Sequence, residues 1–151
     1  MKKISIIVCI FVAIMIAFCG CSNNLSFEVA VLDNKIKQDK EWNEKQIIRS
    51  ISELESLNIT YNISEYTNKY DEDYFRGKSI IVLLFTYPYL GADLHVDSMR
   101  KDGEVIQIGI IEKQKKEATY LTVMSVWTCI IEIDSENIRD ISGIEFEISK
   151  K

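Results

Sequence analysis

One continuous run of apolar residues restricts the fold of this chain more than any other feature of the sequence. Residues 79–86 read Ser-Ile-Ile-Val-Leu-Leu-Phe-Thr, which has the length of a strand and no alternation of polar and apolar positions. Such a run is typical of a strand that is buried on both faces of its sheet. We expect Pro88, the only proline of the chain, to end this strand.

Further strands and one hairpin are predicted on the C-terminal side of this run. Lys101-Asp102-Gly103 is a hairpin signal between two apolar segments, and residues 113–117 are predicted as a charged turn. Apolar and other residues alternate weakly over 27–31, so this segment can form the first strand of a sheet. The other predicted strands are residues 94–99, 105–111, 120–124, 126–133 and 144–148.

One amphipathic helix is predicted before the buried strand. Asp39 has the position of a helix cap, and Asn58 suits the end of the helix. Between them, apolar residues recur mostly every three or four positions and form one stripe: Trp42, Ile47, Ile48, Ile51, Leu54 and Leu57. We expect Trp42 to hold this helix onto the sheet. Residues 59–75 are predicted as a loop that ends in one helical turn.

These elements predict an α+β fold, with one amphipathic helix packed on a mainly antiparallel β-sheet or small β-sandwich. Leu83, Trp127 and Ile131 are expected in its core. The predicted loop contains several tyrosines, which either form a binding surface or pack their rings and leave the hydroxyls in water. These tyrosines are Tyr61, Tyr66, Tyr70 and Tyr74.

The N-terminal segment has the pattern of an export signal. A basic start, Met1-Lys2-Lys3, precedes the apolar residues 4–18, and Gly20 and Cys21 follow. The end of this segment resembles the lipobox of bacterial lipoproteins, which implies that Cys21 receives diacylglycerol and becomes the new N-terminus. Phe18 and Cys19 depart from the usual lipobox residues, so Cys19 is the alternative acylation site. The alternative interpretation is a retained transmembrane helix, but the apolar run at 4–18 is at or below the roughly 17–25 residues that a membrane-spanning helix needs.

The predicted organisation is a signal peptide (1–20), a small polar tether (21–26) and one α+β domain (27–151). The domain is then lipid-anchored at the extracytoplasmic face of the cell membrane. Without residues 1–20 the chain keeps 16 basic and 23 acidic residues, a net charge of −7. Such an acidic domain argues against a nucleic-acid partner, since nucleic acids require basic surfaces.

The sequence lacks the residues that most catalytic mechanisms require. His95 is the only histidine, and no glycine pattern of a nucleotide-binding loop or of a serine hydrolase is present. Cys129, the single thiol left after export and acylation, lies in an apolar run and is expected to be a buried hydrophobe. We therefore predict no enzymatic activity and no cofactor.

Asp93, His95 and Asp97 form the one group that suits a divalent metal ion. They alternate with apolar residues and point to one face of a strand. Neighbours two apart on a strand lie about 6.5–7 Å apart, so one strand rarely supplies three ligands to one ion. A solvated strand face is the main interpretation, and a metal-dependent protein or enzyme is the alternative.

Three features of the C-terminal half occur together: residues 70–75 (Tyr-Asp-Glu-Asp-Tyr-Phe), the hairpin at 101–103 and residues 127–133 (Trp-Thr-Cys-Ile-Ile-Glu-Ile). In these features residues 70–148 resemble the C-terminal domain of the protease-complex subunit PrcB and related small clostridial-type lipoproteins. Residues 86–91 depart from the family's Thr-Gly-Gly-Tyr-type turn, because they contain a single glycine. The resemblance implies a noncatalytic, β-rich domain that contacts other proteins.

The residues after the buried strand are the predicted partner-binding loop. Tyr87, Pro88, Tyr89 and Leu90 are too apolar for an ordinary turn, and exposed aromatic residues mark contact surfaces. The alternative is that these rings fold back and cap the sheet. The predicted function is a noncatalytic binding module, with another envelope protein as its candidate partner. A purely structural envelope lipoprotein is the second alternative.

Overall fold

The computed structural model describes residues 23–36, 41–113 and 121–151. The predicted signal peptide, Cys21 and most of the predicted turn at 113–117 lie outside these ranges. The described strands are β1 (Glu28–Ile36), β2 (Asn43–Ile48), β3 (Lys78–Leu90), β4 (Leu94–Asp102), β5 (Val105–Glu112), β6 (Leu121–Asp134) and β7 (Gly143–Lys150). The helical elements are α2 (Ile51–Tyr61), α3 (Ser64–Thr67), η1 (Tyr74–Arg76) and η2 (Ser135–Ile138). Among the described residues, no helix has the length and apolar composition required to cross a membrane.

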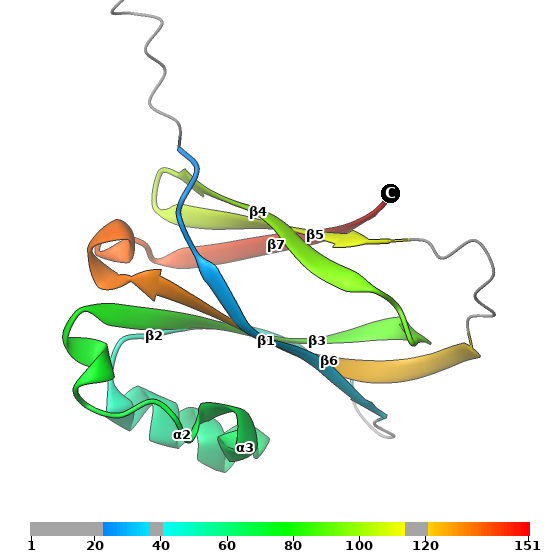
Figure 1. The fold of residues 1–151 in the computed structure, drawn as a ribbon, viewed down its shortest axis with the longest axis horizontal. Coiled ribbons are helices and arrows are strands. Elements are labelled where there is room, and N and C mark those ends of the chain that lie inside the picture. The colour runs from blue at the N-terminus through cyan, green and yellow to red at the C-terminus, as the bar shows by residue number, and fades with distance from the viewer. Residues whose placement is uncertain (1–22, 37–40, 114–120) are drawn as a thin grey trace, which may run out of the picture.

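The strands form two sheets, and the helices cover one of them. One sheet has the order β1-β6-β3-β2 and the other has the order β4-β5-β7. In Figure 1 the three-stranded sheet lies on one side of the four-stranded sheet, and α2 and α3 lie on the other side. All described strand pairs are antiparallel except β5 with β7, which is parallel. The fold is therefore β-rich α+β, as predicted, with mainly antiparallel pairing.

Strand β3 is buried on both faces, which confirms the interpretation of its apolar run. Ile81, Leu83 and Phe85 belong to the core between the two sheets, together with Trp127, Ile131 and residues of β4, β5 and β7. Ile80, Val82 and Leu84 belong to a second core beneath the helices, together with Leu54 and Leu57 of α2. Leu83, Trp127 and Ile131 are all buried, as expected.

The predicted long helix is wrong over residues 43–48, while its predicted cap, Asp39, lies outside the described residues. Residues 43–48 form β2, which pairs with β3 from Asn43 opposite Phe85 to Ile48 opposite Ile80. A buried strand needs hydrogen-bond partners for its backbone along both edges. Strand β6 supplies one edge of β3, and β2 supplies the other.

The helix begins only at Ile51 and runs beyond the predicted end. Ser50 is its N-cap, and its hydroxyl accepts a hydrogen bond from the N–H of Glu53. Asn62, with φ 54°, ends it in the left-handed conformation. The predicted loop at 59–75 thus contains the end of α2 and also α3, while its predicted last helical turn is observed as η1.

Two predicted strand boundaries are also wrong. Pro88 does not end β3, because the strand continues to Leu90 with an irregularity between Tyr87 and Tyr89. Proline lacks an N–H donor and is accepted in a strand at such a bulge. The two strands predicted within residues 120–133 are one strand, β6. The hairpin around Gly103 is observed as predicted, and this glycine has φ +61°.

Candidate functional site

Two groups of residues that the sequence singles out separately lie at the same end of the molecule. Strand β3 finishes with Tyr87–Leu90, a short turn through Gly91 and Asp93 follows, and β4 begins with Leu94 and His95. The last residues of β5 and β7 pair here, Glu112 opposite Lys150. In Figure 1 the C-terminus marks this end. The β3–β4 end is defined by Tyr87, Tyr89, Asp93, His95, Asp97, Glu112, Lys150 and Lys151.

A buried carboxylate is the centre of this end. The Glu112 side chain is 2% exposed, and its Oε2 accepts a hydrogen bond of 2.6 Å from the Tyr87 hydroxyl. Lys150 Nζ lies 3.7 Å from the same oxygen. A buried charge is tolerated only where hydrogen bonds and opposite charges replace water, and these two groups supply both. Glu112 was not predicted as a site residue, although a charged residue directly after the apolar strand 105–111 was a usable signal.

Two tyrosine rings lie beside this carboxylate. The ring centres of Tyr87 and Tyr89 are 5.6 Å apart at an angle of 71°, and Lys150 Nζ lies 4.6 Å from the centre of the Tyr89 ring. Both tyrosines are partly buried and pack against the core between the sheets. Tyr87, Pro88, Tyr89 and Leu90 therefore form the end of a strand and not the predicted loop, and the two rings cap the core. Their role in binding a partner stays a prediction.

The candidate metal ligands do not converge on one point. The His95 ring Nε2 lies 2.8 Å from Asp93 Oδ1, whereas Asp97 pairs with Lys151, whose Nζ lies 3.2 Å from Asp97 Oδ2. An irregularity between Val96 and Ser98 turns Asp97 out of simple alternation with His95. No group of three metal-ligating side chains is present in the described part of the chain. Leu94 and Val96 belong to or pack against the core, as expected for a solvated strand face.

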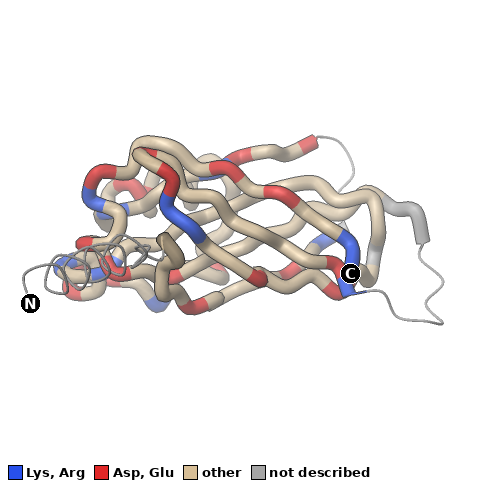
Figure 2. The backbone as a smooth tube through the Cα atoms, turned by 90° about the horizontal axis from the view of Figure 1, so that it is seen from above, with Lys and Arg blue, Asp and Glu red and all other residues tan. Residues whose placement is uncertain are grey.

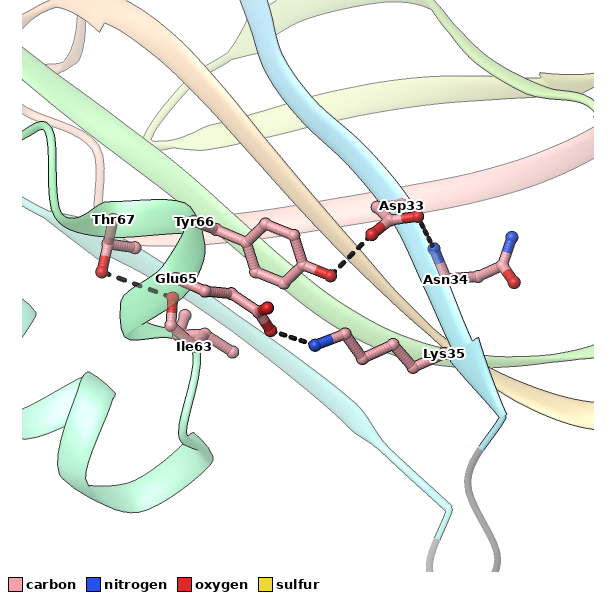
Figure 3. A network of polar contacts seen from close by, with 7 residues as sticks. All are labelled: Asp33, Asn34, Lys35, Ile63, Glu65, Tyr66 and Thr67. Carbon is pink, nitrogen blue, oxygen red and sulfur yellow. Dashed lines mark hydrogen bonds and ion pairs between the residues drawn. The ribbon is translucent and has the colours of Figure 1, made fainter.

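The tyrosines of residues 59–75 pack as rings, and the hydroxyls of Tyr66 and Tyr70 attach α3 and the residues that follow it to the sheet. Figure 3 shows the Tyr66 hydroxyl donating to Asp33 of β1, while Lys35 of β1 pairs with Glu65. The ring centres of Tyr70 and Tyr74 are 4.7 Å apart. These contacts favour the packing interpretation for this cluster, because its rings and the hydroxyls of Tyr66 and Tyr70 make contacts within the domain.

Glu132 of β6 receives several of these hydrogen bonds. Lys69 Nζ donates to its Oε1 at 2.6 Å, and the Tyr70 hydroxyl donates to the same oxygen at 2.9 Å. Burial alone would raise the pKa of the Glu132 carboxyl, but the hydrogen bonds from Lys69 and Tyr70 lower it below its usual value. Burial and the same hydrogen bond raise the pKa of Tyr70. The cluster is thus a structural polar network.

Cys129 is buried in the core between the sheets, as predicted. Burial raises the pKa of its thiol to about 12. A nucleophilic cysteine requires the opposite shift, toward the thiolate at neutral pH. The thiol is therefore a core group and carries no candidate site.

A separate groove of about 460 Å³ lies between β2 and the segment before β7. Ile47, Ile141 and Ile144 are among its lining residues, together with Arg49. The Arg49 guanidinium donates to the carbonyl oxygens of Ile138 and Ile141 at 3.2 and 2.7 Å. This cation therefore ties the connection between β2 and α2 to the segment around η2.

Comparisons with protein-family models, with curated proteins and with solved structures gave no match for this chain. The resemblance to PrcB stays a prediction.

Proposed function

We propose that this chain is an exported lipoprotein, anchored through Cys21, that acts as a noncatalytic binding module. Its partner is a protein at the extracytoplasmic face of the membrane, and it contacts the β3–β4 end. The proposal is carried by one observation, the gathering of two partly exposed tyrosine rings with charged side chains on one rigid end of the sandwich. Aromatic rings within a polar rim are typical of protein-binding surfaces.

The metal-dependent alternative has less support than the binding module. His95 pairs with Asp93, whereas Asp97 pairs with Lys151, so the three proposed ligands do not converge on one point. The purely structural alternative differs from the binding module only in lacking a specific partner. The binding module is distinguished from the purely structural protein if the wild-type chain captures a partner and a variant with a single substitution does not.

Tyr89→Ala tests the binding surface. Tyr89 is preferred to Tyr87, because the Tyr87 hydroxyl also holds the buried Glu112. We expect at least a roughly tenfold loss of affinity for a partner cross-linked and purified from membranes, since removal of an interface aromatic costs about 2 kcal/mol. Arg139→Ala, an exposed substitution outside the β3–β4 end, is the control. Unchanged affinity, or a fall in melting temperature without loss of binding by the folded fraction, contradicts the assignment.

Cys21→Ser tests the anchor independently of any partner. We expect loss of acyl labelling and accumulation of the unprocessed precursor, whereas Cys19→Ser should be labelled and processed normally. Continued labelling of the Cys21→Ser protein moves the site to Cys19. An unlabelled wild-type protein with residues 1–20 intact contradicts the lipoprotein assignment and supports a retained transmembrane helix.

A further inference from the structure

The segment predicted as a tether is part of the folded domain from Asn23 onward. Asn24 forms a bridge with Arg100 of β4. The Leu25 N–H donates to the Met99 carbonyl, and the Lys101 N–H donates to the Asn23 carbonyl, both at 2.9 Å. Residues 23–25 thus extend the edge of β4 as a short antiparallel addition.

Apolar packing adds to these hydrogen bonds. Leu25 and Phe27 are partly buried and pack against the core between the sheets. Backbone pairing together with two apolar side chains distinguishes this segment from a solvated linker, whose backbone would be hydrated. The predicted tether is therefore reduced to the residues before Asn23.

The direction of this pairing determines which end of the domain the N-terminal chain approaches. From Leu25 back to Asn23, the opposite residues of β4 run from Met99 to Lys101, toward the hairpin at Gly103. In Figure 1 the described chain starts beside this hairpin. The β3–β4 end lies at the other end of β4, which at about 3.3 Å per residue is on the order of 26 Å away.

The hairpin end is held together as one rigid unit. Lys101 Nζ pairs with Asp140 Oδ1 at 2.6 Å. The Ser142 and Gly143 N–H groups both donate to the Glu104 carbonyl, at 2.9 and 3.1 Å. The loop before β7 and the β4–β5 hairpin therefore move together with the docked N-terminal segment.

We propose that the docked segment 23–27 sets the orientation of the domain on the membrane, with the hairpin end facing the lipid headgroups and the β3–β4 end pointing away. The inference rests on the proposed acylation of Cys21. One residue, Ser22, separates Cys21 from Asn23, so the Cα atoms of Cys21 and Asn23 lie at most about 7 Å apart. A protein partner of the β3–β4 end would then have to present its contact surface about 25 Å or more above the bilayer.

Contact quenching by lipids carrying a headgroup nitroxide tests this orientation. The full chain is produced in a host that lipidates it, purified and reconstituted into phosphatidylcholine vesicles. A fluorophore is attached through Ser142→Cys at the hairpin end, or through Lys113→Cys, which directly follows Glu112 at the opposite end. Both native residues are exposed, and the buried Cys129 thiol is protected from the label.

We expect several-fold stronger quenching at position 142 than at position 113. A control chain carries twelve Gly/Ser residues between Ser22 and Asn23, which leaves the docked segment intact and gives the domain a flexible leash of about 19 Å. The difference between the two positions should disappear in this control. Equal quenching in the chain without the insertion overturns the orientation. A purified chain without an acyl group that fails to float with the vesicles overturns the proposed anchor instead.

Discussion

At the scale of single residues, buried charge is the feature that most distinguishes this domain from a plain apolar sandwich. Glu112 is 2% exposed and is held by the Tyr87 hydroxyl and by Lys150. Glu132 is held by Lys69 and Tyr70 in the same manner. In both cases a tyrosine hydroxyl from a distant segment donates to a carboxylate on a strand. Tyrosine therefore has a structural role here, whatever surface it also provides.

Tyr87→Phe tests this role at the β3–β4 end. The substitution keeps the ring and removes the donor to Glu112, so we expect a loss of roughly 1–3 kcal/mol in the free energy of unfolding, measured with urea. A double-mutant cycle with Glu112→Gln isolates the contact. The loss of unfolding free energy in the double mutant should be smaller than the sum of the losses in the two single mutants. Strict additivity contradicts a direct Tyr87–Glu112 interaction.

At the scale of elements, the helical layer is held onto the sheet by side chains more than by its own helical propensity. Helix α2 has 11 residues, and a helix of that length is marginal alone. Leu54 and Leu57 bury its inner face. The ring centres of Trp42 and Tyr61 are 4.9 Å apart. Trp42 thus contacts the helix as expected, although it precedes β2 and does not belong to the helix.

Glu132→Gln tests how the segment between α3 and η1 is attached to β6. The pKa of Glu132 is lowered in the folded protein, so its ionised form stabilises the fold above the usual carboxyl pKa, and this contribution is lost as pH falls through the lowered pKa. We expect the variant to be less stable at pH 7 by on the order of 1–2 kcal/mol, with the difference shrinking below about pH 4.

Urea unfolding at pH 7, 5 and 3 measures this effect. Glu147→Gln, at an exposed position of β7, is the matched control and should show a much smaller difference at every pH. A difference for Glu132→Gln that stays constant from pH 7 to pH 3 contradicts the stabilising role of the ionised carboxylate.

At the scale of the whole molecule, two apolar cores share one sheet. The core between the sheets and the core beneath the helices are joined through β3 and β6, whose side chains alternate between them. Figure 2 shows acidic positions spread over the whole tube and fewer basic ones. The stability of such a molecule depends on the shared sheet, because the loss of either covering layer exposes one apolar face of this sheet to water.

Ile131→Ala tests this dependence. Ile131 is fully buried between the sheets, so its truncation should cost on the order of 2–5 kcal/mol and lower the stability of both cores together. Tryptophan fluorescence and far-ultraviolet circular dichroism in urea should report one coincident transition. Ile59→Ala, at a position of α2 that is 87% exposed, is the control and should change stability by less than about 0.5 kcal/mol. A near-zero cost for Ile131→Ala contradicts the assigned core.

Elements whose cause is local could be predicted from the amino-acid sequence alone. The apolar run at 79–86, the hairpin at Gly103 and the burial of Cys129 follow from neighbouring residues, because a run without polar positions needs two covered faces and a glycine readily adopts a positive φ. The predicted site residues could likewise be named individually. No sequence pattern places Tyr87 and Asp93 at one end of the molecule with Glu112 and Lys150, because only the pairing and order of the strands bring these residues together.

Features whose cause is distant in sequence became visible only in the folded molecule. Residues 43–48 carry a helix-like spacing, yet they form β2 because β3 needs a hydrogen-bond partner along its second edge. Asn23–Leu25 is small and polar at its start, yet it pairs with β4 because that edge is available beside it. In both segments the local pattern was weak, and pairing of backbone groups with a remote strand outweighed it.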